Sequence, residues 1–195
     1  MRFQIVLIIV CIVTGQAHGQ GKKTYNFSVS TGAGLFHYIN TLNSGASNVT
    51  ENNACFSFRL MWEPEHRISL GIESGYYRIY SLNLASNASS PLSGKASLSA
   101  FPFYACVKVR VFPHFYLTGG TGTALLFLEV SSAGNTSSDN SLALANSHFS
   151  ALYRRPMSDR FEIGGELKFL NFGKTEDYGF ALLVEVTYKF RFKSE

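Results

Sequence analysis

The residues of this chain best suited to catalysis are a histidine and a serine two positions apart. His148 and Ser150 share one face if their segment is a β-strand, because side chains alternate between faces with a period of two. A tight turn over 155–159 could bring Glu162 back beside Ser150. Serine, histidine and a carboxylate within hydrogen-bonding reach are the parts of an acyl-transfer site. His148, Ser150 and Glu162 are therefore candidate catalytic residues, but we favour the interpretation that they are ordinary strand residues and that the chain is not an enzyme.

Other residues that could bind ligands lack the spacing that such sites need. The run Gly-Gly-Thr-Gly at 119–122 lacks the Lys-Ser/Thr ending of a phosphate-binding loop, so we interpret it as packing space within a strand. The histidines do not have the spacing of metal ligands. Cys55 and Cys106 fall on expected strands that are not neighbours, which predicts two free, buried thiols rather than a disulfide. We predict no metal site and no cofactor.

The first 20 residues have the layout of a signal peptide. Arg2 supplies a positive start, residues 5–13 are apolar, and small residues follow at 17–19. The apolar run is shorter than the roughly 20 residues that a membrane-spanning helix needs. We expect residues 1–20 to be removed on export and residues 21–195 to form one domain.

The chain as a whole is poor in charge and rich in aromatic side chains. Charged residues make up 15% of it and aromatic residues 14%, whereas a soluble domain is roughly 25% charged. The net charge of +4 comes without a basic stripe interleaved with exposed aromatics, so we expect no nucleic-acid partner. No later stretch of 18 apolar residues occurs, so we expect no transmembrane helix.

Between residues 25 and 192 the sequence alternates between apolar and polar residues in eight runs, the period of a β-strand. The expected strands cover about 25–38, 54–62, 68–80, 97–111, 115–130, 142–153, 160–170 and 182–192. Short connections at 63–67, 112–114 and 155–159 alternate with mostly longer ones, rich in Ser, Asn, Gly and Ala, at 40–53, 81–95, 131–141 and 171–178. Short turns at one end and long loops at the other are the layout of a transmembrane β-barrel.

Alternation alone does not tell which face of each strand is inside. In the last strand Leu182, Val184 and Val186 face one way, while Glu185 and Thr187 face the other. A soluble barrel would bury the apolar set, whereas a membrane barrel turns it towards lipid. The unequal connections, the strand lengths and the many small residues on the polar faces favour the membrane barrel, and a soluble secreted β-barrel is the alternative.

With the polar faces inside, the charges must fill a narrow lumen. An eight-stranded barrel leaves little room for a channel, so we expect a salt-bridge network that plugs it. The expected network is Arg59, Glu73, Lys108, Arg110, Glu162, Glu166, Lys168, Glu185, Lys189 and Arg191. Aromatic residues near the strand ends are expected to form two belts at the membrane interfaces, with Trp62, Tyr76, Tyr80, Phe115, Tyr153, Phe161, Phe169, Tyr178, Phe190 and Phe192 as members.

The last strand, 184–192, resembles the aromatic-rich final strand that the barrel assembly machinery recognises, although three further residues follow Phe192. From Tyr25 to Phe192 the layout resembles the small outer-membrane β-barrels of Gram-negative bacteria, the OmpA/OmpX-like and opacity-type group. This resemblance implies an all-β, eight-stranded antiparallel up-and-down barrel in the outer membrane of the cell envelope. It also implies outer-membrane lipid and the assembly machinery as partners, and we expect a monomer.

That group is functionally mixed, so the fold alone does not settle the function. Our leading hypothesis is a structural or surface-interaction role through long extracellular loops, with an extracellular ligand left unidentified. A narrow, porin-like pore or small-solute transporter is the second hypothesis. A lipid A-modifying enzyme is the third, because the His-x-Ser pair followed by a Glu resembles outer-membrane deacylases. Those enzymes have an Asn after the Ser, where this chain has Ala151.

Overall fold

The computed structural model describes residues 24–39, 48–64, 67–84, 94–132, 135–173 and 177–193. The expected signal peptide lies outside these residues. The strands are β1 (Thr24–Tyr38), β2 (Asn48–Thr50), β3 (Asn52–Trp62), β4 (Ile68–Leu84), β5 (Gly94–Phe112), β6 (Phe115–Ser132), β7 (Asn135–Pro156), β8 (Phe161–Phe172) and β9 (Asp177–Lys193). Only Glu51 separates β2 from β3, and both pair with β4, so they serve as one strand of an eight-stranded barrel. Within the described ranges no helix is long and apolar enough to span a membrane.

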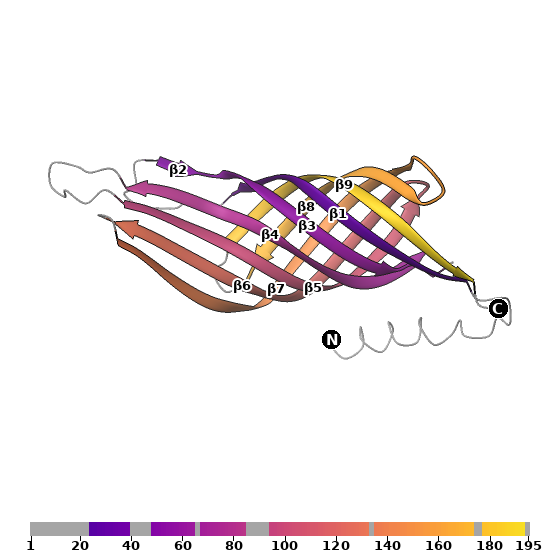
Figure 1. Ribbon diagram of the computed structural model, residues 1–195, viewed down its shortest axis with the longest axis horizontal. Helices are drawn as coiled ribbons and strands as arrows, with labels where there is room; N and C mark the ends of the chain where they lie inside the picture. The colour runs from indigo at the N-terminus through magenta and orange to yellow at the C-terminus, as the bar shows by residue number, and fades with distance from the viewer. Residues whose placement is uncertain are drawn as a thin grey trace.

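With β2 and β3 counted as one strand, every strand pairs antiparallel with its neighbours in the chain, and β9 pairs with β1 to close the barrel (Figure 1). Following paired residues once around the barrel from Ser28 leads back to β1 at Tyr38, ten residues further along. This offset requires strands tilted by about 40° to the barrel axis. The predicted eight-stranded antiparallel up-and-down barrel is confirmed.

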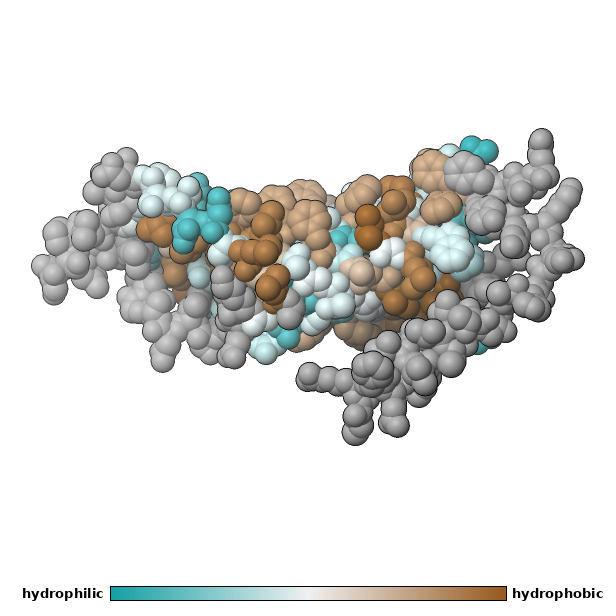
Figure 2. Space-filling view, turned by 90° about the horizontal axis from the view of Figure 1, so that it is seen from below, coloured by the Kyte–Doolittle hydropathy of each residue, from teal (hydrophilic) through white to brown (hydrophobic). Residues whose placement is uncertain are grey.

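The two faces of the barrel are reversed relative to a water-soluble protein. Along β3 buried and exposed residues alternate without a break, and the exposed ones include Phe56, Phe58 and Leu60, while Arg59 is buried. Apolar side chains cover much of the visible flank between the two ends (Figure 2). Leaving this much apolar surface in water would forgo about 25 cal/mol for every Å², whereas lipid solvates it. The fold is that of a barrel built for a bilayer.

Short turns gather at one end of the barrel. The β5–β6 connection is only Pro113-His114, and His114 has a positive φ of 68°. Proline followed by a positive φ is the pattern of a type II turn, which closes a hairpin with two residues. Thr24 and Lys193, at the outer ends of β1 and β9, pair with each other at this same end.

At the opposite end, strands run further than predicted. The predicted loop at 131–141 is wrong, because β6 runs to Ser132 and β7 starts at Asn135 and pairs with it. Strand pairing also takes in both ends of the predicted loop at 81–95, as far as Leu84 and Gly94, and residues 85–93 lie outside the described residues. Figure 1 shows β4 to β7 running past the rest of the barrel. The segment 135–141 is polar on both faces and therefore lacks the alternation by which a strand is predicted from sequence. We call the parts of β5, β6 and β7 at 94–100, 126–132 and 135–141 the extended wall.

On the outward face of β5 the composition changes abruptly where the extended wall begins. Phe101, Phe103, Val107, Val109 and Val111 are exposed and apolar, whereas Ser99, Ser97 and Lys95 follow on the same face. The apolar part, 101–111, has the length of 9–11 residues with which a tilted strand crosses a bilayer. On β5 the outward apolar band therefore ends at Phe101.

Candidate functional sites in the lumen and on the outer wall

The centre of the lumen is one arginine shared by three carboxylates. Arg59 Nε lies 2.7 Å from Glu73 Oε2, and its two terminal nitrogens lie 2.6 Å from Glu166 Oε1 and 3.2 Å from Glu185 Oε2. All four side chains are at most 1% exposed. The five N–H groups of a guanidinium allow one arginine to satisfy several carboxylates at once.

Further cations complete the neutralisation of these carboxylates. Lys168 pairs with Glu73 and lies 3.5 Å from Glu166 Oε2, and Arg154 Nε donates to Glu185 Oε1 at 3.0 Å. Nearer the short turns, Lys108 pairs with Glu63, and Lys189 Nζ lies 2.6 Å from Glu162 Oε1. In the described part of the chain, five Lys or Arg side chains thus pair with five Glu side chains. We call these ten residues the lumen ion-pair network.

The lumen ion-pair network differs in part from the predicted set. Eight of the predicted residues take part: Arg59, Glu73, Lys108, Glu162, Glu166, Lys168, Glu185 and Lys189. The prediction for Arg110 is wrong, because this residue is exposed at the short-turn rim, past the last buried position of β5. The Arg191 side chain lies outside the described residues. Sequence reasoning missed Arg154 and Glu63, although Arg154 continues the inward face of Ser150 and Leu152.

Towards the long-loop end the lumen is filled by apolar side chains. Phe36, Tyr38, Tyr77, Leu170 and Phe172 belong to one buried cluster, in which the rings of Phe36 and Tyr77 meet edge to face with centroids 6.0 Å apart. Tyr38 Oη donates a 2.5 Å hydrogen bond to Asp177 Oδ1. We call this the apolar lumen cluster. The lumen is therefore occupied at two levels, by charge near the short turns and by aromatic and aliphatic groups near the loops.

The predicted aromatic belts are found outside the barrel with one exception. Trp62, Tyr153, Phe161 and Phe190 are exposed and Phe115 is half-buried near the short turns, while Tyr76, Phe169 and Tyr178 are half-buried towards the other end. The placement of Tyr80 in a belt is wrong. A β-bulge between Arg78 and Tyr80 turns Tyr80 inward, where its ring lies 5.5 Å from that of Tyr38. The Phe192 side chain lies outside the described residues.

The structure separates the candidate catalytic residues. His148 and Ser150 do share the lumen face of β7. However, Glu162 pairs in register with Pro156 and binds Lys189, whereas the residue opposite Ser150 is Lys168. The carboxylate near the imidazole is Glu73, whose Oε2 lies 3.6 Å from His148 Nε2. A Ser-His-Glu acyl-transfer arrangement of these three residues is not formed.

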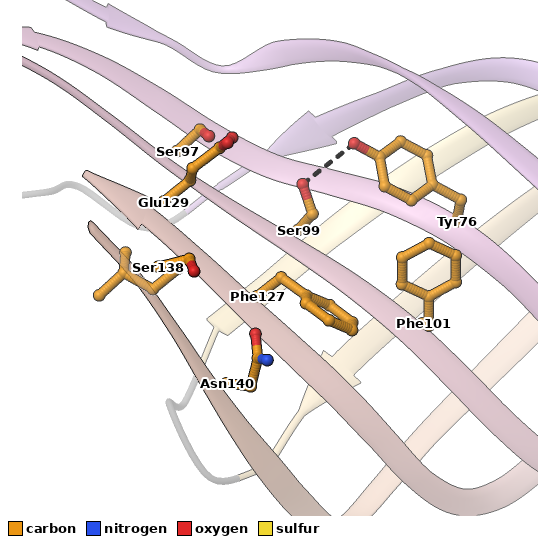
Figure 3. Close-up of a pocket in the computed structure, with 9 residues that line it drawn as sticks. Tyr76, Ser97, Ser99, Phe101, Phe127, Glu129, Ser138 and Asn140 are labelled. Carbon is orange, nitrogen blue, oxygen red and sulfur yellow. Dashed lines mark hydrogen bonds between the residues drawn. The ribbon is translucent and has the colours of Figure 1, made fainter. Parts of the chain in front are cut away.

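A second candidate site is a groove on the outward face of the barrel, where the extended wall meets the apolar band. One aromatic residue from each of three strands lines one end, with ring centroids 5.0 Å apart for Tyr76 and Phe101 and 5.4 Å apart for Phe101 and Phe127. Tyr76 Oη and Ser99 Oγ form a 3.1 Å hydrogen bond (Figure 3). We call this the aromatic groove; its volume is about 350 Å³ and its lining is completed by Ser97, Leu128, Glu129, Ser138 and Asn140.

Glu63 is the network residue that stands outside the strands. Ser28 Oγ donates a 2.6 Å hydrogen bond to Glu63 Oε1, Arg154 Nη1 lies 3.5 Å from the same oxygen, and Lys108 pairs with it. Burial by itself would raise the pKa of Glu63, but Lys108, Ser28 and Arg154 together outweigh it and lower the pKa to about 2.

Replacing Arg59 with Met should destabilise the barrel by about 3–5 kcal/mol, because three buried carboxylates would lose their shared cation. The measurement is urea-induced unfolding in detergent micelles or vesicles. Lys189→Met is the matched control, since Lys189 is 25% exposed at the rim and such pairs contribute at most about 1 kcal/mol. Equal losses for the two variants would contradict a central role for Arg59.

Because the pKa of Glu63 is lowered in the folded state, the barrel should lose stability in acid. A carboxyl whose pKa is lower in the folded state stabilises the fold above its unfolded pKa, near 4.5, and this contribution disappears as the pH falls towards 2. The free energy of unfolding should therefore fall between pH 5 and pH 2, and Glu63→Gln should make that fall shallower. Glu129→Gln, on the outer wall, should keep the wild-type fall; if it flattened the fall as much as Glu63→Gln, the assignment would be wrong.

Comparisons with known proteins agree with this architecture. No family model matches the chain, and no curated protein matches it in sequence. Among solved structures, Ail, the attachment invasion locus protein of Yersinia pestis, is 12% identical with a TM-score of 0.51, over 87% of this chain and all of that one. A major outer membrane protein from Thermus thermophilus is 10% identical with a TM-score of 0.53, over 85% of this chain and 99% of that one. At such low identity the likeness concerns the fold alone, and the chain has the fold of the small eight-stranded β-barrels of bacterial outer membranes.

Proposed function

We propose that this protein is an outer-membrane barrel with a closed lumen, which acts through its outer surface rather than by transport or catalysis. The observation that carries the proposal is the double filling of the lumen. The lumen ion-pair network occupies the part near the short turns, and the apolar lumen cluster occupies the part near the loops. A solute would have to displace buried ion pairs and packed rings in turn, each at a large cost.

The proposed location follows from the fold, the apolar band and the signal-peptide layout of residues 1–20. In this orientation the short turns face the periplasm, and the extended wall projects from the cell surface. The last strand, β9, carries outward Val184, Val186 and Phe190, the aromatic-ended pattern proposed for recognition by the assembly machinery. The protein would then work as a monomeric scaffold that presents the wall and its connecting segments.

The closed lumen is tested by single-channel recording in planar bilayers. The refolded protein should give no conductance steps, because the charged level and the apolar level each block the lumen. Phe172→Ala serves as a matched variant: it thins the apolar level and leaves the charged one intact, so it should stay silent as well. Regular conductance steps from the wild-type protein would contradict the proposal and favour the narrow-pore alternative.

We further propose that the aromatic groove holds the sugar head group of a glycolipid in the outer leaflet. The groove opens sideways at the level where the apolar band ends, so its nearest neighbour is a lipid head group. Tyr76, Phe101 and Phe127 offer ring faces, and the serines and Asn140 offer polar groups that fix orientation, the usual division of labour in a binding site. The carboxylate of Glu129 favours sugar hydroxyls over phosphate.

The double change Phe101→Ala and Phe127→Ala should lower the amount of glycolipid that co-purifies with the barrel from outer membranes. Mass spectrometry of the extracted lipid measures it, with Phe58→Ala as the matched control because Phe58 is also exposed on the apolar band. Equal glycolipid retention by both variants would exclude the groove. Isolated oligosaccharide forms a second arm: binding that needs no lipid would assign the groove to a soluble or cell-surface glycan instead.

A further inference from the structure

Three potential metal ligands from three strands converge in the lumen. Glu73 of β4, Cys106 of β5 and His148 of β7 are all buried, and one donor atom from each lies within 4.8 Å of the other two. The three residues are far apart in the sequence, at 73, 106 and 148, so the spacing rules of short metal motifs could not reveal them. Closing the barrel is what brings them together.

A glycine allows the sulfur and the imidazole to lie side by side over the backbone of β6. Cys106, Gly120 and His148 are successive partners in one row across β5, β6 and β7. A Cβ atom on Gly120 would lie 2.4 Å from His148 Cε1, 2.8 Å from Cys106 Sγ and 3.0 Å from His148 Nδ1. The sulfur and the edge of the imidazole that carries Nδ1 therefore both lie directly over Gly120. Gly119, on the outward face, has no such contact, and its nearest neighbour would be a backbone oxygen 3.9 Å away.

The imidazole over Gly120 lacks hydrogen-bond partners within the described chain. Neither Nδ1 nor Nε2 of His148 has one, although both are buried. Nε2 is directed towards Glu73, 3.6 Å away, and the ring is held against that of Tyr104 with centroids 4.7 Å apart. Cys106 Sγ makes one weak contact, 3.9 Å to the Tyr104 carbonyl. A buried polar atom without a partner is unfavourable, and a bound ion between Nδ1 and Sγ would remove that penalty.

The surroundings select the kind of ion. The lumen ion-pair network is balanced, with five cations and five carboxylates. A monovalent cation that displaces the thiol proton of Cys106 leaves the net charge of the lumen unchanged. A divalent cation would add one unit of positive charge close to Lys168 and Arg59. Thiolate is a soft ligand that favours copper(I), and imidazole also suits copper. Zinc would need four ligands, but Glu73 is already bound by two cations.

We infer that Cys106 Sγ and His148 Nδ1 bind one copper(I) ion in the lumen. The carboxylate of Glu73, 3.6 Å from Nε2, favours the tautomer that carries its proton on Nε2 and leaves Nδ1 free for the ion. A carboxylate that fixes a metal-binding histidine through its other nitrogen is a common arrangement. In the binding step the S–H bond of Cys106 breaks, an S–Cu bond forms, and the proton leaves to water. The copper stays monovalent, so no oxidant or reductant is consumed.

The test uses the full barrel, refolded without oxygen in the presence of copper(I) supplied as its acetonitrile complex, because the filled lumen leaves the ion no path to the site after folding. We expect one copper per barrel after desalting against a copper(I) chelator, and X-ray absorption should show one sulfur and one nitrogen scatterer. Cys106→Ser and His148→Gln should reduce retained copper to background. Cys55→Ser is the matched control, because Cys55 is also a free, buried thiol but belongs to the apolar lumen cluster; it should retain copper fully. Zinc offered alone should be retained at least about tenfold less.

A second pair of variants leaves both ligands in place. Gly120→Ala should abolish copper retention, because the added methyl group displaces the imidazole and the sulfur. Gly119→Ala should not change it. Heat-dependent gel mobility shows whether each variant is folded. Any of three results would overturn the inference: no copper in the wild-type barrel, equal copper in Cys106→Ser, or loss of copper only in Cys55→Ser.

Discussion

The structure depends on one constraint: a barrel in lipid must neutralise its interior with its own side chains. An eight-stranded lumen is just wide enough for side chains, so there is little room for water to screen charge. Arg59 meets this constraint by contacting three carboxylates at once, and the remaining partners form around it. Breaking a buried pair is costly even where the intact pair contributes little net stability. The network thus fixes the lumen chemistry and holds facing strands together across the barrel.

This constraint also explains how the lumen is divided. Near the short turns, long Lys, Arg and Glu side chains reach across the axis and meet, while small residues such as Ser30 and Gly164 on the same face give them room. Near the loops, the interior can be filled by rings such as Phe36 and Tyr77, which need no partner charges. The two fillings are complementary: one uses directional bonds to set the arrangement of strands, and the other excludes water by packing.

The fold and most inward-facing residues could be predicted from the sequence, because apolar and polar residues alternate visibly along a single strand. The inward positions of Arg59 and Glu185 follow from a period of two within a single strand. The predictions that failed depend on how one strand pairs with another. The inward turn of Tyr80 depends on a bulge against β5. The strand at 135–141 is polar on both faces and depends on its pairing with β6. The row Cys106–Gly120–His148 depends on the register of two hairpins. That register cannot be predicted from residue spacing within one strand.

The same physics separates the parts of this barrel that can vary from those that cannot. The charges at the centre of the lumen are coupled to several others, so a change at Glu73 affects Arg59, Lys168 and the imidazole of His148 together. The outward residues of the extended wall, such as Ser97 and Ser138, face water and the groove instead. A substitution there changes the surface without disturbing the interior balance. New surface recognition can therefore arise on the wall at little cost to folding, while the lumen can only be rebuilt by several changes at once.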